Sequence, residues 1–399
     1  MSKYDFETRV DRRGTGSSKW NQMLGWNPNV SEGVVPLSVA DMELKNAPEI
    51  IEGLKDFLDT AVLGYTAAYP AYIEAVRGWM KKHHNFDFAD SELSVTGGVV
   101  AAFNSVVRAF TKPGDGVILM RPIYYPMGFA IANNGRKEVN VPLINKEGVY
   151  TIDFEKYEEA CKDPNNKLLI FCSPHNPVGR VWTKEELKKI GDIALANDVL
   201  VLSDEIWLDF TYEDSKHTVF TTVDEAFKKN TIVCTAASKT FNLAGLKCSN
   251  IFVANPELKA IYDKQLMADN VSGSGILGYK GTELAYSKAE GWYEEMIELI
   301  KANRDYTYKF FADNYPKMKV TKLEGTYLIW VDMSCLGLDD KALEEFLHME
   351  AEFFTDEGYV FGPEGSGYER INIACTKEIL ADAYAKLKKH LDPLYEKVK

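Results

Sequence analysis

Three short apolar runs in the middle of the chain are each followed by a side chain that can take part in catalysis. These side chains are Asn176 after residues 168–172, Asp204 after residues 199–202 and Lys239 after residues 231–235. If the runs are neighbouring strands of a parallel sheet, their carboxyl ends meet at one edge, where open α/β sheets bind ligands. We therefore expect this amide, this carboxylate and this amine to share one site.

A pair of glycines supplies an anion-binding element for the same region. Residues 95–99 have the sequence Val-Thr-Gly-Gly-Val and lead from a short strand into a helix that we expect to reach about Phe110. Glycines at a helix N-terminus let backbone N–H groups approach an anion closely, and the helix dipole favours negative charge there. Gly98 and Val99 are thus candidates for binding a phosphate.

Together these groups fit pyridoxal 5′-phosphate (PLP). The amine of Lys239 can hold the aldehyde as a Schiff base once desolvation or a neighbouring cation lowers its pKa. A carboxylate at Asp204 can pair with the pyridinium nitrogen and make the ring an electron sink. Asn176 can hydrogen-bond the 3-hydroxyl of the ring, and a hydroxyl from Ser238 or Thr235 can add to the phosphate site.

Each residue taken alone has a simpler explanation, which the sequence leaves open. A Gly-Gly pair before a helix is more often a turn, and a carboxylate such as Asp204 can cap a helix or end a strand. A Ser-Lys pair such as residues 238–239 is usually exposed to solvent. The joint position of these residues at the ends of strands favours the cofactor site.

An α/β domain must position these residues. The three runs are apolar on both faces, as are strands of a parallel sheet that helices cover. Between the first two runs, Thr183 and Glu186 form a capping box that begins an amphipathic helix extending to about Asn197. The resulting βαβ unit predicts a doubly wound large domain with a mainly parallel sheet.

The two ends of the chain have a different pattern. The first 45 or so residues are rich in Gly, Pro and Asn, so we expect an arm rather than a core. The C-terminal part has a long helical pattern at 292–315 and short strands at 327–331 and 370–374, which is typical of a smaller α+β domain. The predicted division is an N-terminal arm contributing to the small domain (1–47), a large PLP-binding domain (48–288) and a C-terminal small domain (289–399).

Composition argues against several classes of protein. The formal charge of −13 argues against a nucleic-acid partner and against docking on an anionic membrane surface. No apolar run approaches the roughly 18 residues that a membrane span needs, and the charged first 13 residues lack a secretory signal. The six cysteines form no CxxC pair and the six histidines show no metal-ligand spacing. We expect reduced thiols, no metal site and a cytoplasmic protein.

The motifs around these residues resemble those of the aminotransferase-like, fold-type-I PLP enzymes. They are SPHNPVG at 173–179, DEI at 204–206 and SKTFNLAG at 238–245. Within that superfamily the chain resembles the cystalysin-type C–S lyases, the MalY/PatB group of cystathionine β-lyases, over essentially its whole length. This likeness is carried by VPLSVADME at 35–43, VLGYT at 62–66, TKPGDGV at 111–117, PIYYP at 122–126, EGTY at 324–327 and ERIN at 369–372.

The resemblance implies further site residues. Tyr124 stacks on the PLP ring, and Tyr65 reaches the phosphate of the neighbouring subunit in a homodimer with shared active sites. Arg370 binds the substrate carboxylate, with Asn176 and Tyr125 also at the substrate. A bidentate guanidinium suits a carboxylate better than a lysine does. A structural ion pair for Arg370 and core packing for the tyrosines are the alternatives that the residue types alone leave open.

Two positions depart from the pattern of aminotransferase relatives. Those relatives often place a Tyr three residues after the ring-pairing Asp, where this chain has Trp207, whose indole only donates a hydrogen bond. They also often place an Arg on the phosphate eight residues after the Schiff-base lysine. Here that residue is Lys247, a point charge without the bidentate fork. The missing Tyr favours a reaction other than ordinary transamination.

The resemblance implies α,β-elimination from an L-cysteine-type amino acid. In that reaction Lys239 removes the Cα proton, a thiolate leaves from Cβ, and pyruvate and ammonia are released. The alternatives are an aminotransferase, which shares every cofactor contact, and a PLP-retaining regulatory protein that acts through a protein partner. The preferred sulfur substrate is left open by the sequence.

Overall fold

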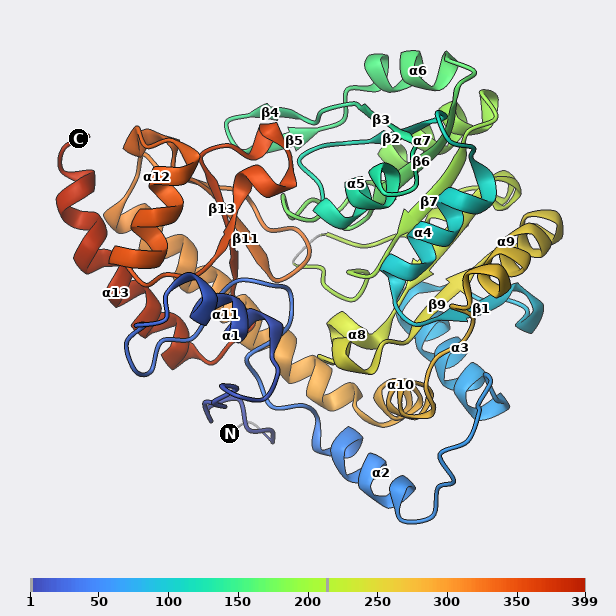
Figure 1. The fold of residues 1–399 in the computed structure, drawn as a ribbon, viewed down its shortest axis with the longest axis horizontal. Coiled ribbons are helices and arrows are strands. Elements are labelled where there is room, and N and C mark those ends of the chain that lie inside the picture. Colours follow the sequence, from blue (N-terminus) through green and yellow to red (C-terminus); the bar gives the residue numbers. More distant parts are fainter. Residues whose placement is uncertain (1–2, 213–214, 399) are drawn as a thin grey trace.

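The largest element of the fold is a seven-stranded sheet, seen in a computed structural model that describes residues 3–212 and 215–398 (Figure 1). Only β9 runs against the other strands, because β1 and β8 both pair with it in antiparallel fashion. The predicted mainly parallel α/β sheet is confirmed. Its spatial order is β1 (Leu93–Thr96), β9 (Ser249–Phe252), β8 (Thr231–Thr235), β7 (Leu200–Asp204), β6 (Asn166–Cys172), β2 (Gly116–Leu119) and β3 (Lys137–Asn140).

Helices cover both faces of this sheet, which explains why its central strands are apolar throughout. Leu169 and Val201 pack in one core with residues of α6 and α7. Ile170 and Leu202 point the other way, into the core that contains α4. The helices of this part are α2 (Pro48–Leu58), α3 (Pro70–His84), α4 (Val99–Phe110), α5 (Tyr125–Ala132), α6 (Phe154–Lys162), α7 (Lys184–Ala196), α8 (Ala237–Thr240), α9 (Pro256–Asp269) and α10 (Ile276–Lys288).

The capping box predicted for the helix of the βαβ unit is present in the structure. The hydroxyl of Thr183 accepts a hydrogen bond from the Glu186 N–H at 3.1 Å, and the Glu186 carboxylate accepts one from the Thr183 N–H at 2.8 Å. Two of the four N–H groups that a helix start leaves without partners are satisfied in this way. Helix α7 therefore begins where the sequence places it and joins β6 to its parallel neighbour β7.

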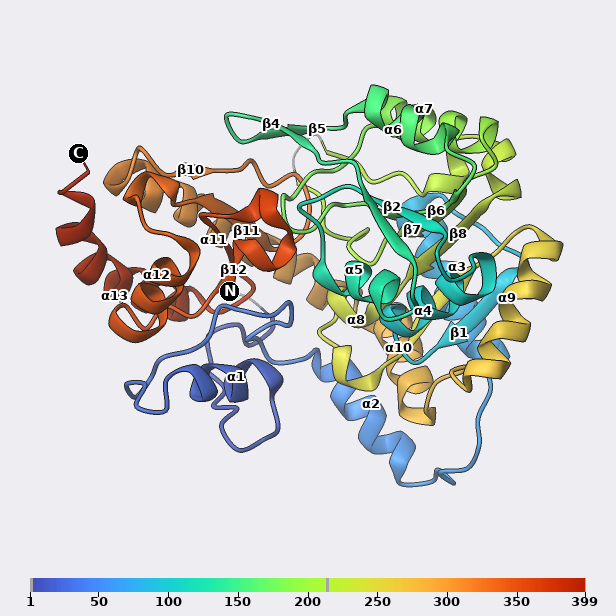
Figure 2. The same ribbon diagram turned by 45° about the horizontal axis from the view of Figure 1, so that its top comes forward.

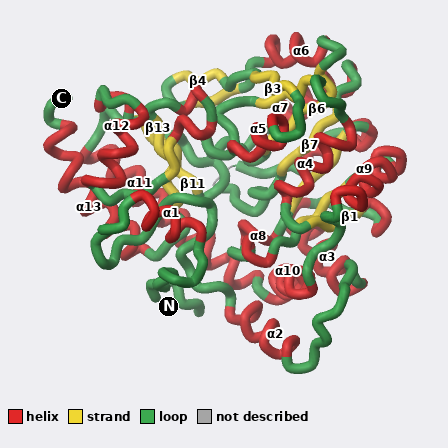
Figure 3. Tube along the Cα trace, viewed as in Figure 1, coloured by secondary structure: helices red, strands yellow, loops and turns green. Residues whose placement is uncertain are grey.

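A second, antiparallel sheet lies beside the first and belongs to the C-terminal part of the chain (Figures 1 and 2). Its order is β10 (Lys319–Val320), β11 (Leu328–Asp332), β13 (Tyr368–Asn372) and β12 (Asp356–Glu357). A two-stranded ribbon, β4 (Ile144–Lys146) and β5 (Val149–Thr151), stands apart from both sheets. Figure 3 shows β11 and β13 well separated from the strands of the large sheet.

The helices of the C-terminal part agree with the sequence, whereas one strand is displaced. They are α11 (Glu290–Asn314), α12 (Asp340–Glu345) and α13 (Lys377–Tyr395). Strand β13 ends at Asn372 rather than at residue 374. The Ile373 N–H still donates to the carbonyl of Tyr327, next to β11, but the carbonyl of Ala374 accepts from the Glu43 N–H of the N-terminal segment. Among the described residues no helix combines the length and the apolarity that crossing a membrane requires.

The N-terminal segment is more than the arm that its composition predicts. It contains α1 (Ser18–Trp26), where Trp20 and Met23 are three residues apart on one face and pack with Phe354 in a core of their own. The expectation that this segment lacks a core is wrong, since these two apolar side chains are buried at helical spacing. The Leu37 N–H also donates to the carbonyl of Phe354. The domain boundaries after residues 47 and 288 stay a prediction.

Candidate active site

The ends of β6, β7 and β8 meet at one edge of the large sheet, as predicted. Cys172, Asp204 and Cys234 are register partners across the three strands. Asp204 is the last residue of β7, Asn176 lies in the loop after β6, and Lys239 lies on α8, which begins directly after β8. All three side chains line one cavity of about 340 Å³.

Most of the other predicted residues line the same cavity. Thr235 does not, although its hydroxyl is buried without a hydrogen-bond partner, so Ser238 is the better placed of the two candidate hydroxyls. Sequence reasoning did not single out Ala40 and Cys172, which also line the cavity, and their apolar side chains gave no chemical signal. The predicted residues at the cavity are Gly98, Val99, Tyr124, Asn176, Asp204, Ser238, Lys239 and Lys247, together with Trp207.

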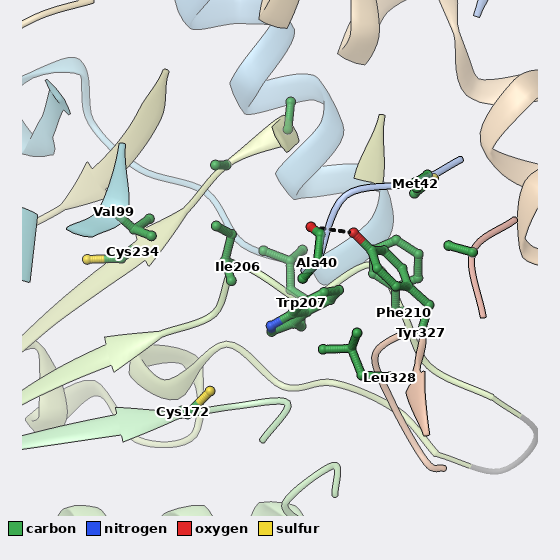
Figure 4. Packing of buried hydrophobic residues seen from close by; sticks show 14 of the residues in the cluster. Ala40, Met42, Val99, Cys172, Ile206, Trp207, Phe210, Cys234, Tyr327 and Leu328 are labelled. Carbon is green, nitrogen blue, oxygen red and sulfur yellow. Dashed lines mark hydrogen bonds between the residues drawn. The ribbon is translucent and has the colours of Figure 1, made fainter. Parts of the chain in front are cut away.

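The amine of Lys239 is held in the cavity by a backbone oxygen. Its Nζ donates to the Ala40 carbonyl at 2.7 Å and lies 5.3 Å from the centre of the Trp207 ring. The same carbonyl accepts a hydrogen bond from the Tyr327 hydroxyl at 2.9 Å, and Figure 4 shows these rings packed around Ala40. Burial, followed by the charge of Arg370, lowers the pKa of Lys239 to about 8. The neutral, reactive form of the amine is therefore accessible near neutral pH.

An unusual backbone conformation places that carbonyl. Val39 has a φ of 50°, which is an outlier for a β-branched residue. Its N–H donates to the Asp356 carboxylate at 3.0 Å, and its carbonyl accepts from the Asn372 side chain at 2.7 Å. Asn372 also donates to the carbonyl of Asp41 at 2.7 Å. Hydrogen bonds on both sides of Ala40 thus fix the turn that points its oxygen at Lys239.

Asp204 is a buried carboxylate without a cationic partner. It forms no ion pair with any residue that the structure describes, and its one hydrogen bond comes from the Ile206 N–H at 3.3 Å. Burial raises the pKa of Asp204 to about 7. A buried charge of this kind needs a compensating cation or proton, and the protonated nitrogen of a pyridine ring supplies both.

The N-terminus of α4 forms an anion cradle in the same cavity. Gly98 precedes the helix with a φ of 116°, a conformation that side chains with a Cβ rarely adopt, and nothing occupies the space where a Cβ would point. The first helical bond runs from the Ala102 N–H to the Gly98 carbonyl, so the N–H groups before it are not used within the helix. Lys247 lines the cavity with them and provides a positive charge.

Arg370 is buried and connects the cavity to the small sheet. Its Nη1 donates to Asn176 Oδ1 at 2.9 Å, and its Nε and Nη2 donate to Asp356 Oδ2 at 3.2 and 2.6 Å. A guanidinium has five N–H groups, so one on Nη1 and one on Nη2 are left for another partner. Sequence reasoning missed Asp356, because nothing in the residues around it indicates that it faces Arg370.

The three tyrosines occupy different environments. Tyr124 lines the cavity, and burial raises the pKa of its phenol well above the usual value. Tyr125 packs beside it, against Phe361, outside the residues that line the cavity. Tyr65 is fully exposed and does not reach the cavity of its own chain.

Comparisons with known proteins agree with this geometry. The chain is 36% identical to "Cystathionine beta-lyase PatB" of Bacillus subtilis, over 96% of this chain and 99% of that protein. The structure of PLP-containing cystalysin from Treponema denticola is 47% identical, with a TM-score of 0.97 over 98% of this chain and 99% of that one.

A third relative is the PLP-bound C–S lyase from Staphylococcus hominis. It is 31% identical, with a TM-score of 0.91 over 97% of this chain and 98% of that one. Residues 27–387 match the family described as "Aminotransferase class I and II". The strand-end motifs predicted this relationship, and the chain belongs to the class I and II aminotransferase family, with the fold-type-I architecture of its PLP enzymes.

Proposed function

We propose that the protein is a PLP-dependent C–S lyase that catalyses α,β-elimination from a sulfur-containing amino acid such as cystathionine or cysteine. The observation that carries the proposal is one cavity that brings together a lysine amine of lowered pKa, a buried carboxylate and a helix N-terminus. A buried arginine outside the cavity lining donates a hydrogen bond to Asn176 in its wall. Relatives across nearly the whole chain carry the names cystathionine beta-lyase and C–S lyase. The enzyme class follows from these two findings together.

The cavity residues fit PLP. When bound, PLP supplies an aldehyde that condenses with an amine and a ring that takes up the electron pair released at the substrate Cα. Lys239 would hold the aldehyde, and Asp204 would keep the ring nitrogen protonated. The free N–H groups at the start of α4, with Ser238 and Lys247, would hold the phosphate.

Lys239 is suited to move the Cα proton. An amine with a pKa of about 8 is a competent general base near neutral pH. The Ala40 carbonyl holds this amine at a fixed position, so its approach to Cα needs little reorganisation.

Arg370 is suited to orient the substrate. Asp356 and Asn176 occupy three of its N–H groups and leave a fork of two, which matches the two oxygens of an α-carboxylate. Because the guanidinium is held in place by these partners, it fixes the direction from which Cα meets Lys239.

Tyr124 is suited to protonate the leaving group. Burial raises its pKa, so the phenol keeps its proton at neutral pH and can donate it to a departing thiolate. The Cβ–S bond breaks, the thiol leaves, and water converts the remaining three-carbon fragment to pyruvate and ammonia.

We further propose that the enzyme works as a homodimer with shared active sites, in the cytoplasm. Tyr65 is fully exposed next to the exposed apolar side chains of Val62 and Leu63, as a segment that enters a neighbouring subunit would be. The six cysteines are free thiols, which suits a reducing compartment.

Reduction with borohydride should attach PLP to Lys239, because its amine is the one buried in the cavity with a lowered pKa. The measurement is loss of the visible cofactor band followed by peptide mapping. The Lys247→Arg variant is the matched control and should still be labelled at Lys239. Label on Lys247 of the wild-type protein, or no label, would contradict the assignment.

Replacing Arg370 by Lys should raise KM for amino-acid substrates by about 100-fold, since losing charge-assisted hydrogen bonds costs about 3 kcal/mol. The lysine keeps a positive charge opposite Asp356, so the fold and the cofactor absorbance should persist. Arg180→Lys, at a partly buried ion-pair site outside the residues that line the cavity, serves as the control and should leave KM unchanged. A variant that loses PLP yet binds substrate normally shows that the role is misassigned.

Mixing two inactive variants tests the shared active site. Lys239→Ala and Tyr65→Phe should together regain part of the activity, because one of the two sites in the hybrid dimer receives both wild-type residues. Lys239→Ala mixed with Arg370→Leu should regain none, because both changes disable the site of the chain that carries them. A fully active monomer in light scattering would rule the arrangement out.

Pyruvate release should exceed transamination by a wide margin. Once Cα has lost its proton, a substrate with a thiolate at Cβ expels it more readily than it is reprotonated on the cofactor. The assay compares pyruvate from L-cystathionine with glutamate formed from 2-oxoglutarate and a panel of amino donors. Faster glutamate formation would make the protein an aminotransferase. The absence of both products would favour the regulatory alternative.

A further inference from the structure

A buried cluster of two carboxylates and an imidazole lies outside the PLP cavity. Glu344 is near the end of α12, His348 lies on the π-helical turn Phe346–Glu350 that continues it, and Glu357 is on β12. One side-chain oxygen or nitrogen from each lies within 4.8 Å of the others. His348 is 3% exposed and Glu357 is 7% exposed, so two of the three groups are shielded from water.

Glu357 brings a buried oxygen that has no hydrogen-bond partner. Its Oε1 is inaccessible to solvent and accepts no hydrogen bond from any residue that the structure describes, and His348 Nε2 lies 3.4 Å from it. An orphaned carboxylate oxygen in the interior is costly unless a cation or a proton meets it.

Acidic side chains outnumber basic ones around this oxygen. Asp356 and Glu369 are also buried, and Glu357 lies opposite Glu369 in the register of β12 and β13. Arg370 contacts Asp356, while Glu369 has the hydroxyl of Thr355 as its partner at 2.7 Å. Lys341 contacts Glu344. An additional cation at Glu357 would therefore stabilise the buried carboxylates.

The imidazole of His348 is held in a fixed orientation. Its ring stacks on Trp26 at 4.2 Å and on Phe354 at 5.3 Å, which fixes the plane of the imidazole. Imidazole nitrogen is the commonest metal ligand in proteins. Lys341 and Tyr359 both bind Oε2 of Glu344, on the outer side of the cluster.

We propose that Glu344, His348 and Glu357 bind a divalent transition-metal ion of the zinc class, with water completing the coordination. One imidazole nitrogen and two carboxylate oxygens form a donor set that zinc and its neighbours in the first transition row accept. One of its ligands, Glu357, directly follows Asp356, the ion-pair partner of Arg370. The ion would connect the end of α12 to β12. The search for histidine spacing missed this site, because its signal is a Glu and a His four residues apart on one helical turn.

The test is zinc binding to the holoenzyme after treatment with a chelator, followed by calorimetry, and the visible bands of cobalt(II) as a second readout. The wild-type protein should bind one ion per chain. His348→Ala should weaken binding at least tenfold, whereas His390→Ala, which removes an imidazole from α13, should not change it. The cofactor absorbance of each variant reports that it is folded.

Glu344→Gln provides a second test, because this residue is only partly buried and its loss disturbs the core least. It too should weaken zinc binding at least tenfold. Wild-type protein that binds no zinc would mean that a proton, not a metal, neutralises Glu357 and would overturn the proposal. Zinc that binds equally well to the wild-type protein, His348→Ala and Glu344→Gln would overturn it as well, since the ion would then lie elsewhere, for example on the PLP phosphate.

Discussion

The active site depends on one buried guanidinium that contacts both sheets. Arg370, on β13 of the small sheet, donates to Asn176 from the loop after β6 of the large sheet and to Asp356 on β12. Removing one partner of a buried ion pair leaves the other charge uncompensated, at a cost of about 3–5 kcal/mol. The two sheets (Figure 1) are therefore connected at the place where we propose that a substrate carboxylate binds.

The sequence predicts the parts of the site that follow from parallel strand pairing. Asn176, Asp204 and Lys239 meet because three consecutive apolar runs form adjacent strands, and a local capping box begins the helix between the first two. Asp356 and Ala40 could not be predicted in this way. Their positions depend on the packing of segments far apart in the chain, and neither residue type nor spacing records that packing. Tyr65 was inferred from resemblance alone, and in the single chain its side chain is fully exposed, so any contact with a cofactor depends on the proposed dimer.

Trp207 occupies the position where many aminotransferases have a Tyr, and its surroundings show what it does instead. Its ring packs edge-on against Tyr327 and Phe210 and lies under the Lys239 amine. An indole face attracts a cation, so it favours the charged amine and opposes the effect of burial. Burial and the charge of Arg370 lower the pKa of Lys239, and the indole face acts against them. The Trp207 ring thus gives the amine an apolar contact surface, and its indole cannot accept a hydrogen bond from a cofactor.

The acceptor for Lys239 is a main-chain oxygen, and this has a consequence for which substitutions the site tolerates. A backbone carbonyl is present whatever residue stands at position 40, so substitution there leaves the contact intact. The contact depends instead on what bends the chain, namely the left-handed conformation of Val39 and the side chains of Asp356 and Asn372 that hold it. Substitutions at these two residues, far away in the sequence, would therefore displace the acceptor of the Lys239 amine although neither touches that amine.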